Sequence, residues 1–141
     1  MPLKFIIVTC LLLAAALPAA PAAAQENEGP TTRDLIAEQL DGYREALELG
    51  DYEWSQVETI LRSAIRERIA IGRRYGLEDE AALAALDRKQ RRDLGRDLEE
   101  AREFTDERME RYLDKEQFER FEEYEDSLYD AIEARIEASA D

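Results

Sequence analysis

Leu113-Asp114-Lys115-Glu116-Gln117-Phe118 decides the fold, because this stretch carries the signals of a helix start. Asp114 is the expected N-cap, where a carboxylate accepts a backbone N–H of the first helical turn. Gln117, three residues later, can reach back to the N–H of the cap residue and complete a capping box. Leu113 and Phe118 lie on either side, at the two positions that pack as a hydrophobic staple. The stretch therefore predicts a helix that begins directly after Asp114.

Apolar residues recur at helical spacing on both sides of this stretch, and no proline follows Pro30. No run of alternating β-branched residues is present, so strands are not expected. We predict an all-α domain, an elongated hairpin of four helices. We expect the first three helices at about 32–49, 53–75 and 79–112, and the fourth from 115 onward. The domain as a whole should span 32–136 and be followed by a frayed tail at 137–141.

The expected helices carry narrow apolar stripes, such as Trp54, Val57, Leu61 and Ile65 in the second helix. Polar residues occupy the rest of each helix surface. An extended hairpin of this size buries too little apolar area to be more than marginally stable. A homodimer would complete the core, so we predict that the chain dimerises.

The N-terminus has the pattern of a Sec-type export signal. Lys4 is a positive n-region, 5–16 is an apolar stretch, and Ala22-Ala23-Ala24 is a small-residue cleavage site. We expect residues 1–24 to be removed and 25–31 to form a flexible leader. The mature protein would then be periplasmic, without stable insertion in a membrane.

The N-terminus allows two other interpretations, a transmembrane helix and a lipoprotein signal. A transmembrane helix is disfavoured because the apolar run is short and Pro18 and Pro21 interrupt its end. A lipoprotein is disfavoured because Cys10 lies inside the apolar run, away from the cleavage point. We expect Cys10 to be removed with the signal.

Composition excludes several classes of function. The chain has no His, and its one Cys lies in the expected signal, so Ser-His-Asp, Cys-His and thiolate or imidazole metal sites cannot be built. We predict no enzymatic activity, no cofactor and no metal site. The cluster Glu122-Glu123-Glu125-Asp126 lacks the glycine turn and ligand spacing of a calcium loop, so a solvated helix face is the better interpretation.

Charge also restricts the partners. The chain has 34 Asp and Glu against 19 Lys and Arg, a net charge of −15, which argues against binding nucleic acid. Basic residues exceed acidic ones only in the centre, 62–96. Two interpretations of this centre remain open: solvated helix faces with i,i+4 pairs, or a positive surface that meets a client or the acidic end of a second copy. The candidate basic interaction surface consists of Arg88, Lys89, Arg91 and Arg92.

The capping pattern recurs upstream in weaker form. Tyr52-Glu53-Trp54-Ser55-Gln56-Val57 has Gln at the matching place, and Leu86-Asp87-Arg88-Lys89-Gln90 fits the pattern inside the expected third helix. Capping boxes are common in helical proteins, so this further copy shows that the pattern also arises by chance.

The two remaining segments resemble the LTxxQ repeats of the Spy/CpxP family of exported helical proteins. In the second copy Leu113 and Gln117 hold the family positions and Asp114 replaces Thr; in the first only Gln56 is kept. The order of elements is also similar: a signal, a short first helix, a motif, a long helix and a second motif. The motif and capping candidates are Tyr52, Glu53, Gln56, Leu113, Asp114, Gln117 and Phe118.

The resemblance implies a curved antiparallel dimer that acts as an ATP-independent periplasmic chaperone or envelope-stress accessory protein. Its partners would be unfolded client proteins or an envelope sensor. A heavy-metal sensor or resistance protein of the same superfamily is the first alternative, and the absence of His disfavours it. A structural helical envelope protein without client activity is the second.

Overall fold

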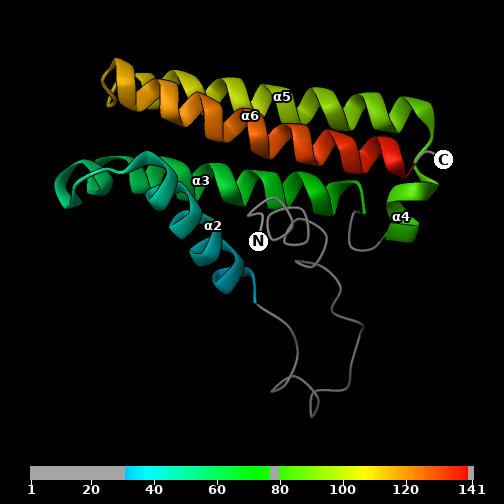
Figure 1. The fold of residues 1–141 in the computed structure, drawn as a ribbon. Helices are drawn as coiled ribbons and strands as arrows, with labels where there is room; N and C mark the ends of the chain where they lie inside the picture. The colour runs from blue at the N-terminus through cyan, green and yellow to red at the C-terminus, as the bar shows by residue number, and fades with distance from the viewer. Residues whose placement is uncertain (1–30, 77–79, 140–141) are drawn as a thin grey trace, which may run out of the picture.

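The computed structural model describes residues 31–76 and 80–139, and all regular structure in these ranges is helical (Figure 1). This confirms the predicted all-α class. The expected signal, 1–24, lies outside the described residues, as does the leader except Thr31. Within the described ranges, no helix is long and apolar enough to cross a membrane. The helices are α2 (Thr32–Leu47), α3 (Asp51–Arg74), α4 (Glu80–Ala85), α5 (Arg88–Glu110) and α6 (Lys115–Ala138).

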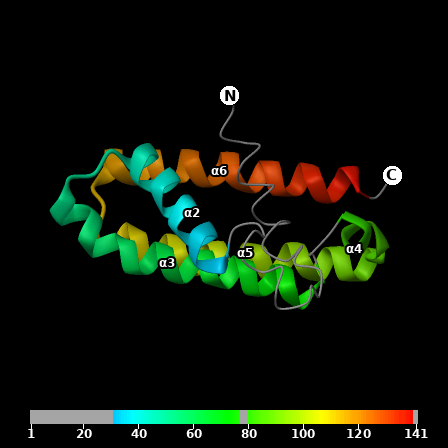
Figure 2. The same ribbon diagram turned by 90° about the horizontal axis from the view of Figure 1, so that it is seen from below.

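Three long helices lie alongside one another, and a fourth crosses them. α5 and α6 form an antiparallel hairpin, and α3 runs antiparallel to α5 beside it (Figures 1 and 2). α2 packs obliquely on α3 and α6 near the turn between α5 and α6. The short α4 lies at the opposite end, where the chain turns from α3 to α5.

The core divides into two clusters along the length of the molecule. The first joins α2, α3, Met109 of α5 and the start of α6, and Tyr43, Leu47, Leu61 and Phe121 in it are fully buried. The second joins the end of α3 and α4 to α5 and α6; its buried members are Ile71, Leu83, Leu94, Leu98, Leu128, Tyr129 and Ile132. A groove between α3 and α5 runs beside both clusters, from Ile60 of the first to Ile71 of the second.

The predicted third helix over 79–112 is wrong as a single element. It breaks between Ala85 and Arg88, because Asp87 caps a new helix. The Asp87 carboxylate accepts the Gln90 N–H at 2.7 Å, and Gln90 Oε1 accepts the Asp87 N–H at 2.8 Å. The segment expected inside the third helix is therefore a capping box that starts α5.

The last helix is longer than the expected domain. α6 continues to Ala138, whereas a frayed tail was expected over 137–141. Ile136 packs against the second cluster, and its carbonyl accepts a hydrogen bond from Arg91 at 2.8 Å. These two contacts explain why residues 137 and 138 are still helical; residues 140–141 lie outside the described residues.

Gly42 allows α2 to approach α6 closely. A Cβ at this position would lie 2.6 Å from the hydroxyl oxygen of Tyr124, which is closer than real contacts. The Tyr124 ring cannot retreat freely, because it packs edge-on against Tyr43 with centroids 4.8 Å apart. A glycine inside a helix costs about 1 kcal/mol relative to alanine, and here the close approach offsets that cost.

Gly42→Ala is expected to lower the free energy of unfolding by about 1 kcal/mol, because the clash outweighs the gain in helix propensity. In a Tyr124→Phe background the hydroxyl is absent, and Gly42→Ala should become neutral or stabilising. Urea unfolding of the four proteins of this cycle measures the coupling. Equal effects of Gly42→Ala in both backgrounds would show that the Tyr124 hydroxyl is not the obstacle.

Candidate functional site

The motif at Asp114 is confirmed as a capping box. Asp114 Oδ1 accepts the Gln117 N–H at 2.8 Å, and Gln117 Oε1 accepts the Asp114 N–H at 2.9 Å. Leu113 and Phe118 both pack, partly buried, against the first core cluster, as expected of a staple. The predicted start of the last helix at Lys115 is therefore correct.

The first motif does not cap a helix. α3 begins one turn earlier than the motif requires, with Gly50 as its N-cap, so Tyr52 and Glu53 lie inside the first turn. Gln56 instead donates from Nε2 to the Tyr52 hydroxyl at 3.1 Å. The two motifs nevertheless meet, because Gln117 Nε2 donates a hydrogen bond to Glu53 Oε2. Their role in this structure is to join the starts of α3 and α6.

The candidate basic surface divides into two kinds of residue. Arg88, Lys89 and Arg92 are exposed at the start of α5. Arg91 is half-buried, and its guanidinium donates to five oxygens of the surrounding backbone and side chains. Arg91 is therefore a structural bridge rather than part of a free basic surface, and none of the four residues lines the groove described next.

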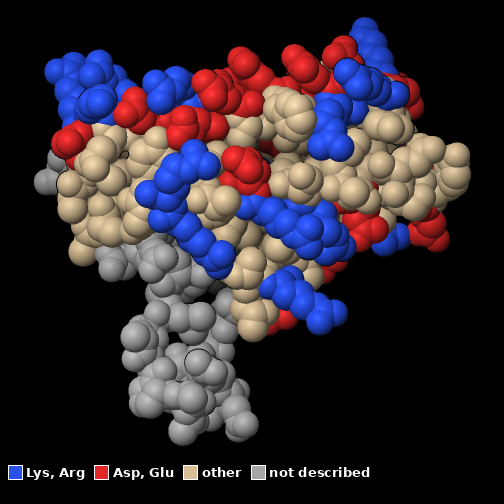
Figure 3. All heavy atoms as spheres, turned by 180° about the vertical axis from the view of Figure 1, so that it is seen from behind, with Lys and Arg blue, Asp and Glu red and all other residues tan. Residues whose placement is uncertain are grey.

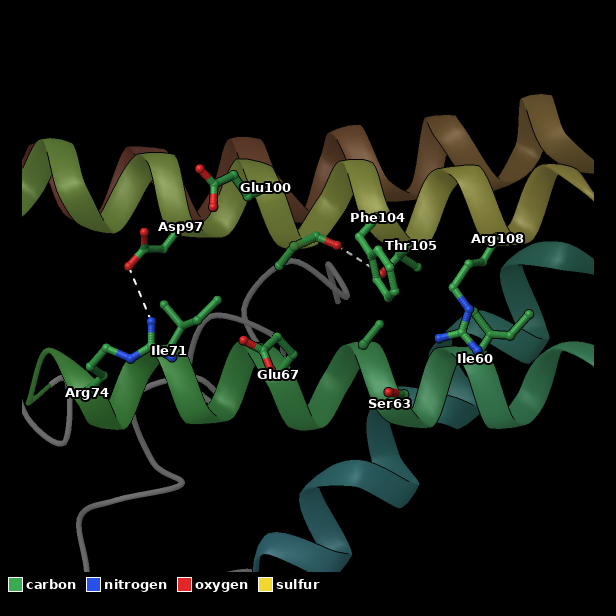
Figure 4. A pocket seen from close by; sticks show the side chains of 12 residues that line it. Ile60, Ser63, Glu67, Ile71, Arg74, Asp97, Glu100, Phe104, Thr105 and Arg108 are labelled. Carbon is green, nitrogen blue, oxygen red and sulfur yellow. Dashed lines mark hydrogen bonds and ion pairs between the residues drawn. The ribbon is translucent and has the colours of Figure 1, made fainter.

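An open groove of about 310 Å³ lies between α3 and α5 (Figure 4). Ile60, Ala64 and Ile71 of α3 and Ala101 of α5 give it apolar walls. Charged groups from both helices stand among them, and the remaining lining residues are Ser63, Glu67, Arg74, Asp97, Glu100, Phe104, Thr105 and Arg108. The groove therefore offers apolar surface and charges of both signs.

Phe104 is the most exposed apolar side chain of the groove. It is 62% exposed, and its side chain projects from α5 toward α3 (Figure 4). The Arg108 guanidinium lies 5.5 Å from the centre of its ring, within cation–π range. Phe104 therefore presents exposed apolar surface beside a cation.

One end of the groove is closed by hydrogen bonds between α3 and α5. Arg74 Nη1 lies 3.4 Å from Asp97 Oδ2, and the Tyr75 hydroxyl donates to the same oxygen at 2.6 Å. The hydrogen bond raises the pKa of Tyr75 above its usual value. Asp97 thus joins the end of α3 to the middle of α5 and leaves the region around Phe104 open.

Both helices that form the groove carry charges of both signs. The exposed glutamates of α5 are Glu99, Glu100, Glu103 and Glu107, and α5 also carries exposed arginines near its start; α3 carries exposed Arg66, Arg73 and Arg74 together with Glu67. Seen from behind, acidic side chains lie along the upper edge of the molecule between basic clusters at its two ends, and further basic side chains cross its middle (Figure 3). A chain in the groove would meet both signs of charge.

A buried polar network connects the helices behind the groove. Arg68 is 2% exposed; its Nη1 donates to the Tyr43 hydroxyl at 2.9 Å and its Nη2 to Gln39 Oε1 at 3.2 Å. The Tyr43 hydroxyl in turn donates to Glu125 Oε1 at 2.6 Å. Burial raises the pKa of Tyr43 well above its usual value, so the phenol remains a donor. The network joins α2, α3 and α6.

A second set of charges lies beside the network, between α5 and α6. Arg102 donates from Nη2 to Asp126 and lies with its guanidinium carbon 5.0 Å from the centre of the Tyr129 ring. Its Nε is 3.9 Å from Asp106 Oδ2. Burial, together with the carboxylate of Glu125, raises the pKa of Asp106 to about 7. Among the described residues, no group of three or more acidic side chains is placed to hold a metal ion.

Sequence reasoning did not find the groove. Phe104 lies off the face of α5 that carries the buried residues Leu94, Leu98 and Met109. The apolar periodicity of the expected third helix, 79–112, therefore does not include it. An aromatic residue off the core stripe was the available signal. The groove also needs residues of α3, such as Ile60, and no sequence pattern shows which face of α3 meets α5.

A scan against protein-family models, a search of curated proteins and a search of solved structures each found no match to this chain. Its function is therefore inferred from its own motifs and from the groove between α3 and α5.

Proposed function

We propose that the mature chain is a periplasmic ATP-independent chaperone or envelope-stress accessory protein of the Spy/CpxP type, which binds unfolded client segments between α3 and α5. The observation that carries the proposal is the exposed Phe104 in a groove lined by apolar and charged side chains. Exposed apolar surface in a hollow is typical of sites that bind other chains. No catalytic residue is part of the proposal.

The composition of the groove suits weak and reversible binding. Ile60, Ile71 and Phe104 supply apolar contacts for side chains that a folded protein would bury. Arg108 and Glu100 supply charges that attract polar segments without fixing one geometry. The groove is open and presents few fixed hydrogen-bonding groups, so it would bind client segments by their apolar content rather than by one specific sequence.

The arrangement of the chain is also consistent with the family resemblance. An export-type N-terminus is followed by a short first helix, and the second motif opens the last long helix with a capping box at Asp114. We include in the proposal the elongated helical hairpin and the curved antiparallel dimer. Exposed Tyr112 is further apolar surface that such a dimer would cover.

Phe104→Ala is expected to weaken protection of a heat-aggregating client while leaving the fold intact. Burying a large apolar side chain contributes about 1.5–3 kcal/mol. Losing about 1 kcal/mol of that would lower client affinity roughly fivefold. Light scattering of the client during heating, at several chaperone concentrations, measures the change. Protection by the wild type should also fall as salt rises, because charges near the groove are screened beyond about 8 Å at physiological ionic strength.

Tyr52→Ala is the matched control, since it removes an exposed aromatic residue that does not line the groove. It should protect the client as well as the wild type does. Equal loss in both variants would indicate a general effect of surface aromatics and not a groove. Absence of any protection by the wild type would reject chaperone activity altogether and favour a structural envelope protein.

A further inference from the structure

Two carboxyl groups from neighbouring helices each have one buried oxygen atom that accepts no hydrogen bond from the described residues. Glu125 of α6 is 2% exposed, and Asp106 of α5 has a side chain 28% exposed. Within the described part of the chain, Glu125 Oε2 and Asp106 Oδ1 are both buried and neither has a hydrogen-bond partner. A buried carboxylate oxygen without a donor costs more free energy than a surface ion pair returns. A proton on one of the groups would supply a donor and remove one charge.

The cations nearby do not meet this need. Arg102 donates to Asp126, and its closest approach to Asp106 is 3.9 Å from Nε, too long for a hydrogen bond. Arg68, from α3, uses its two terminal nitrogens on Tyr43 and Gln39. Glu125 receives its one hydrogen bond from Tyr43. Neither guanidinium donates a hydrogen bond to Asp106 Oδ1 or Glu125 Oε2, and Arg68 Nε is itself buried without a partner among the described residues.

The remaining charges around Asp106 are negative. Glu99 on its own helix and Glu122 on α6 both disfavour a second charge there, in addition to Glu125. Burial is the largest cause of the raised pKa of Asp106, about 7, and Glu125 is the next. Arg102 is the group that opposes these effects. Geometry and charge thus agree that this position holds a proton more readily than an ordinary aspartate does.

We infer that Asp106 keeps its proton at neutral pH, and that releasing this proton to water weakens the packing of α5 against α6. This carboxyl group is a proton-linked switch built into the hairpin. The inference does not depend on the proposed function, although α5 also carries Phe104, two residues before Asp106.

The direction of the pH effect follows from the raised pKa. The pKa of Asp106 is about 7 in the folded chain and 3.8 when unperturbed. The unfolded state therefore gives up its proton first as pH rises, and the folded state loses stability as pH increases through about 7. On acidification, stability at this site rises between pH 8 and about 4 and is constant below that. A salt-bridged carboxylate would give the opposite slope.

The test compares wild type, Asp106→Asn and Asp130→Asn by thermal melts from pH 5 to pH 8.5. Asp130 is an exposed residue of α6, so its variant removes the same charge from a solvated position. The wild-type Tm should fall by several degrees between pH 5.5 and pH 8, relative to Asp106→Asn. At pH 8 the Asp106→Asn variant should melt at a higher temperature than both other proteins. Parallel curves for wild type and Asp106→Asn would overturn the inference.

A second measurement reads the proton directly and does not depend on stability. Carboxyl ¹³C shifts of the folded protein should show one titration with a midpoint between pH 6 and pH 8. This titration should be absent in Asp106→Asn and should move to lower pH in Glu125→Gln. A wild type in which every carboxyl titrates below pH 5.5 would contradict the inference, and would mean that water satisfies the two buried oxygens.

Discussion

Arg68→Met is expected to destabilise the fold by about 4 kcal/mol, the largest effect predicted here. Removing one partner from a buried ionic network typically costs about 3–5 kcal/mol, because the other charge stays buried without compensation. Arg68 is 2% exposed, and Glu125, equally buried, would lose the only nearby cation of the inner network. Urea unfolding followed by circular dichroism measures the loss.

The physical reason is electrostatic rather than steric. Methionine keeps most of the apolar volume of the arginine stem, so the loss of charge and hydrogen bonds dominates. Tyr43 and Gln39 would each lose a donor, since both accept from Arg68. The Arg68 guanidinium also lies 5.6 Å and 5.9 Å from the ring centres of Tyr43 and Tyr129, and these contacts would disappear.

Two further variants separate this explanation from simple loss of packing. Arg66→Met changes an exposed arginine of the same helix and should alter stability by less than about 0.5 kcal/mol. Arg68→Met combined with Glu125→Met removes both charges and should recover much of the loss, as with other buried pairs replaced by apolar residues. A double variant that is less stable than Arg68→Met would show that the network is not the cause.

Arg91→Ala is expected to cost about 2 kcal/mol, which is large for a partly exposed residue. Hydrogen bonds from a charged donor contribute about 1.5–3 kcal/mol when their partners are left unsatisfied. The Arg91 guanidinium donates to the carbonyls of Leu83, Ala84 and Leu86 and to Ile136 O and Ser139 Oγ, at 2.8–3.3 Å. It thereby joins the end of α4 to the end of α6. Thermal melts should show a Tm lowered by several degrees.

Arg88→Ala and Arg92→Ala are the matched controls, because both residues lie in the same turn of α5 and are exposed. Each should leave the Tm within about a degree or two of wild type, as expected of surface substitutions. Similar losses in all three variants would indicate that the positive charge of this turn matters as a whole. Such a result would restore the basic surface, with Arg91 as a member, as an element of function.

Local signals placed one helix start correctly and another wrongly: the last helix begins at Lys115 as expected, whereas Gly50 caps α3 before the motif at Tyr52. Asp114 and Gln117 form the capping box that their spacing predicts, and Asp87 and Gln90 form another. The apolar pattern runs on from Leu86 to Leu94, so the sequence predicts a single helix across Asp87, whereas the structure has two. A cap at Asp87 competes with continuation of the preceding helix. Here a new helix starts, because the Asp87 and Gln90 side chains satisfy backbone N–H groups at its beginning.

The sequence by itself determined the all-helical class, the helix that starts at Lys115 and the absence of histidine, which excludes imidazole chemistry. These follow from residue type and short-range spacing, which act within one or two turns. The tertiary structure alone decided which polar residues are buried, such as Arg68 and Glu125, and which apolar ones remain exposed, such as Phe104. The reason is that burial depends on how helices distant in sequence are placed against one another, and narrow apolar stripes do not specify that placement.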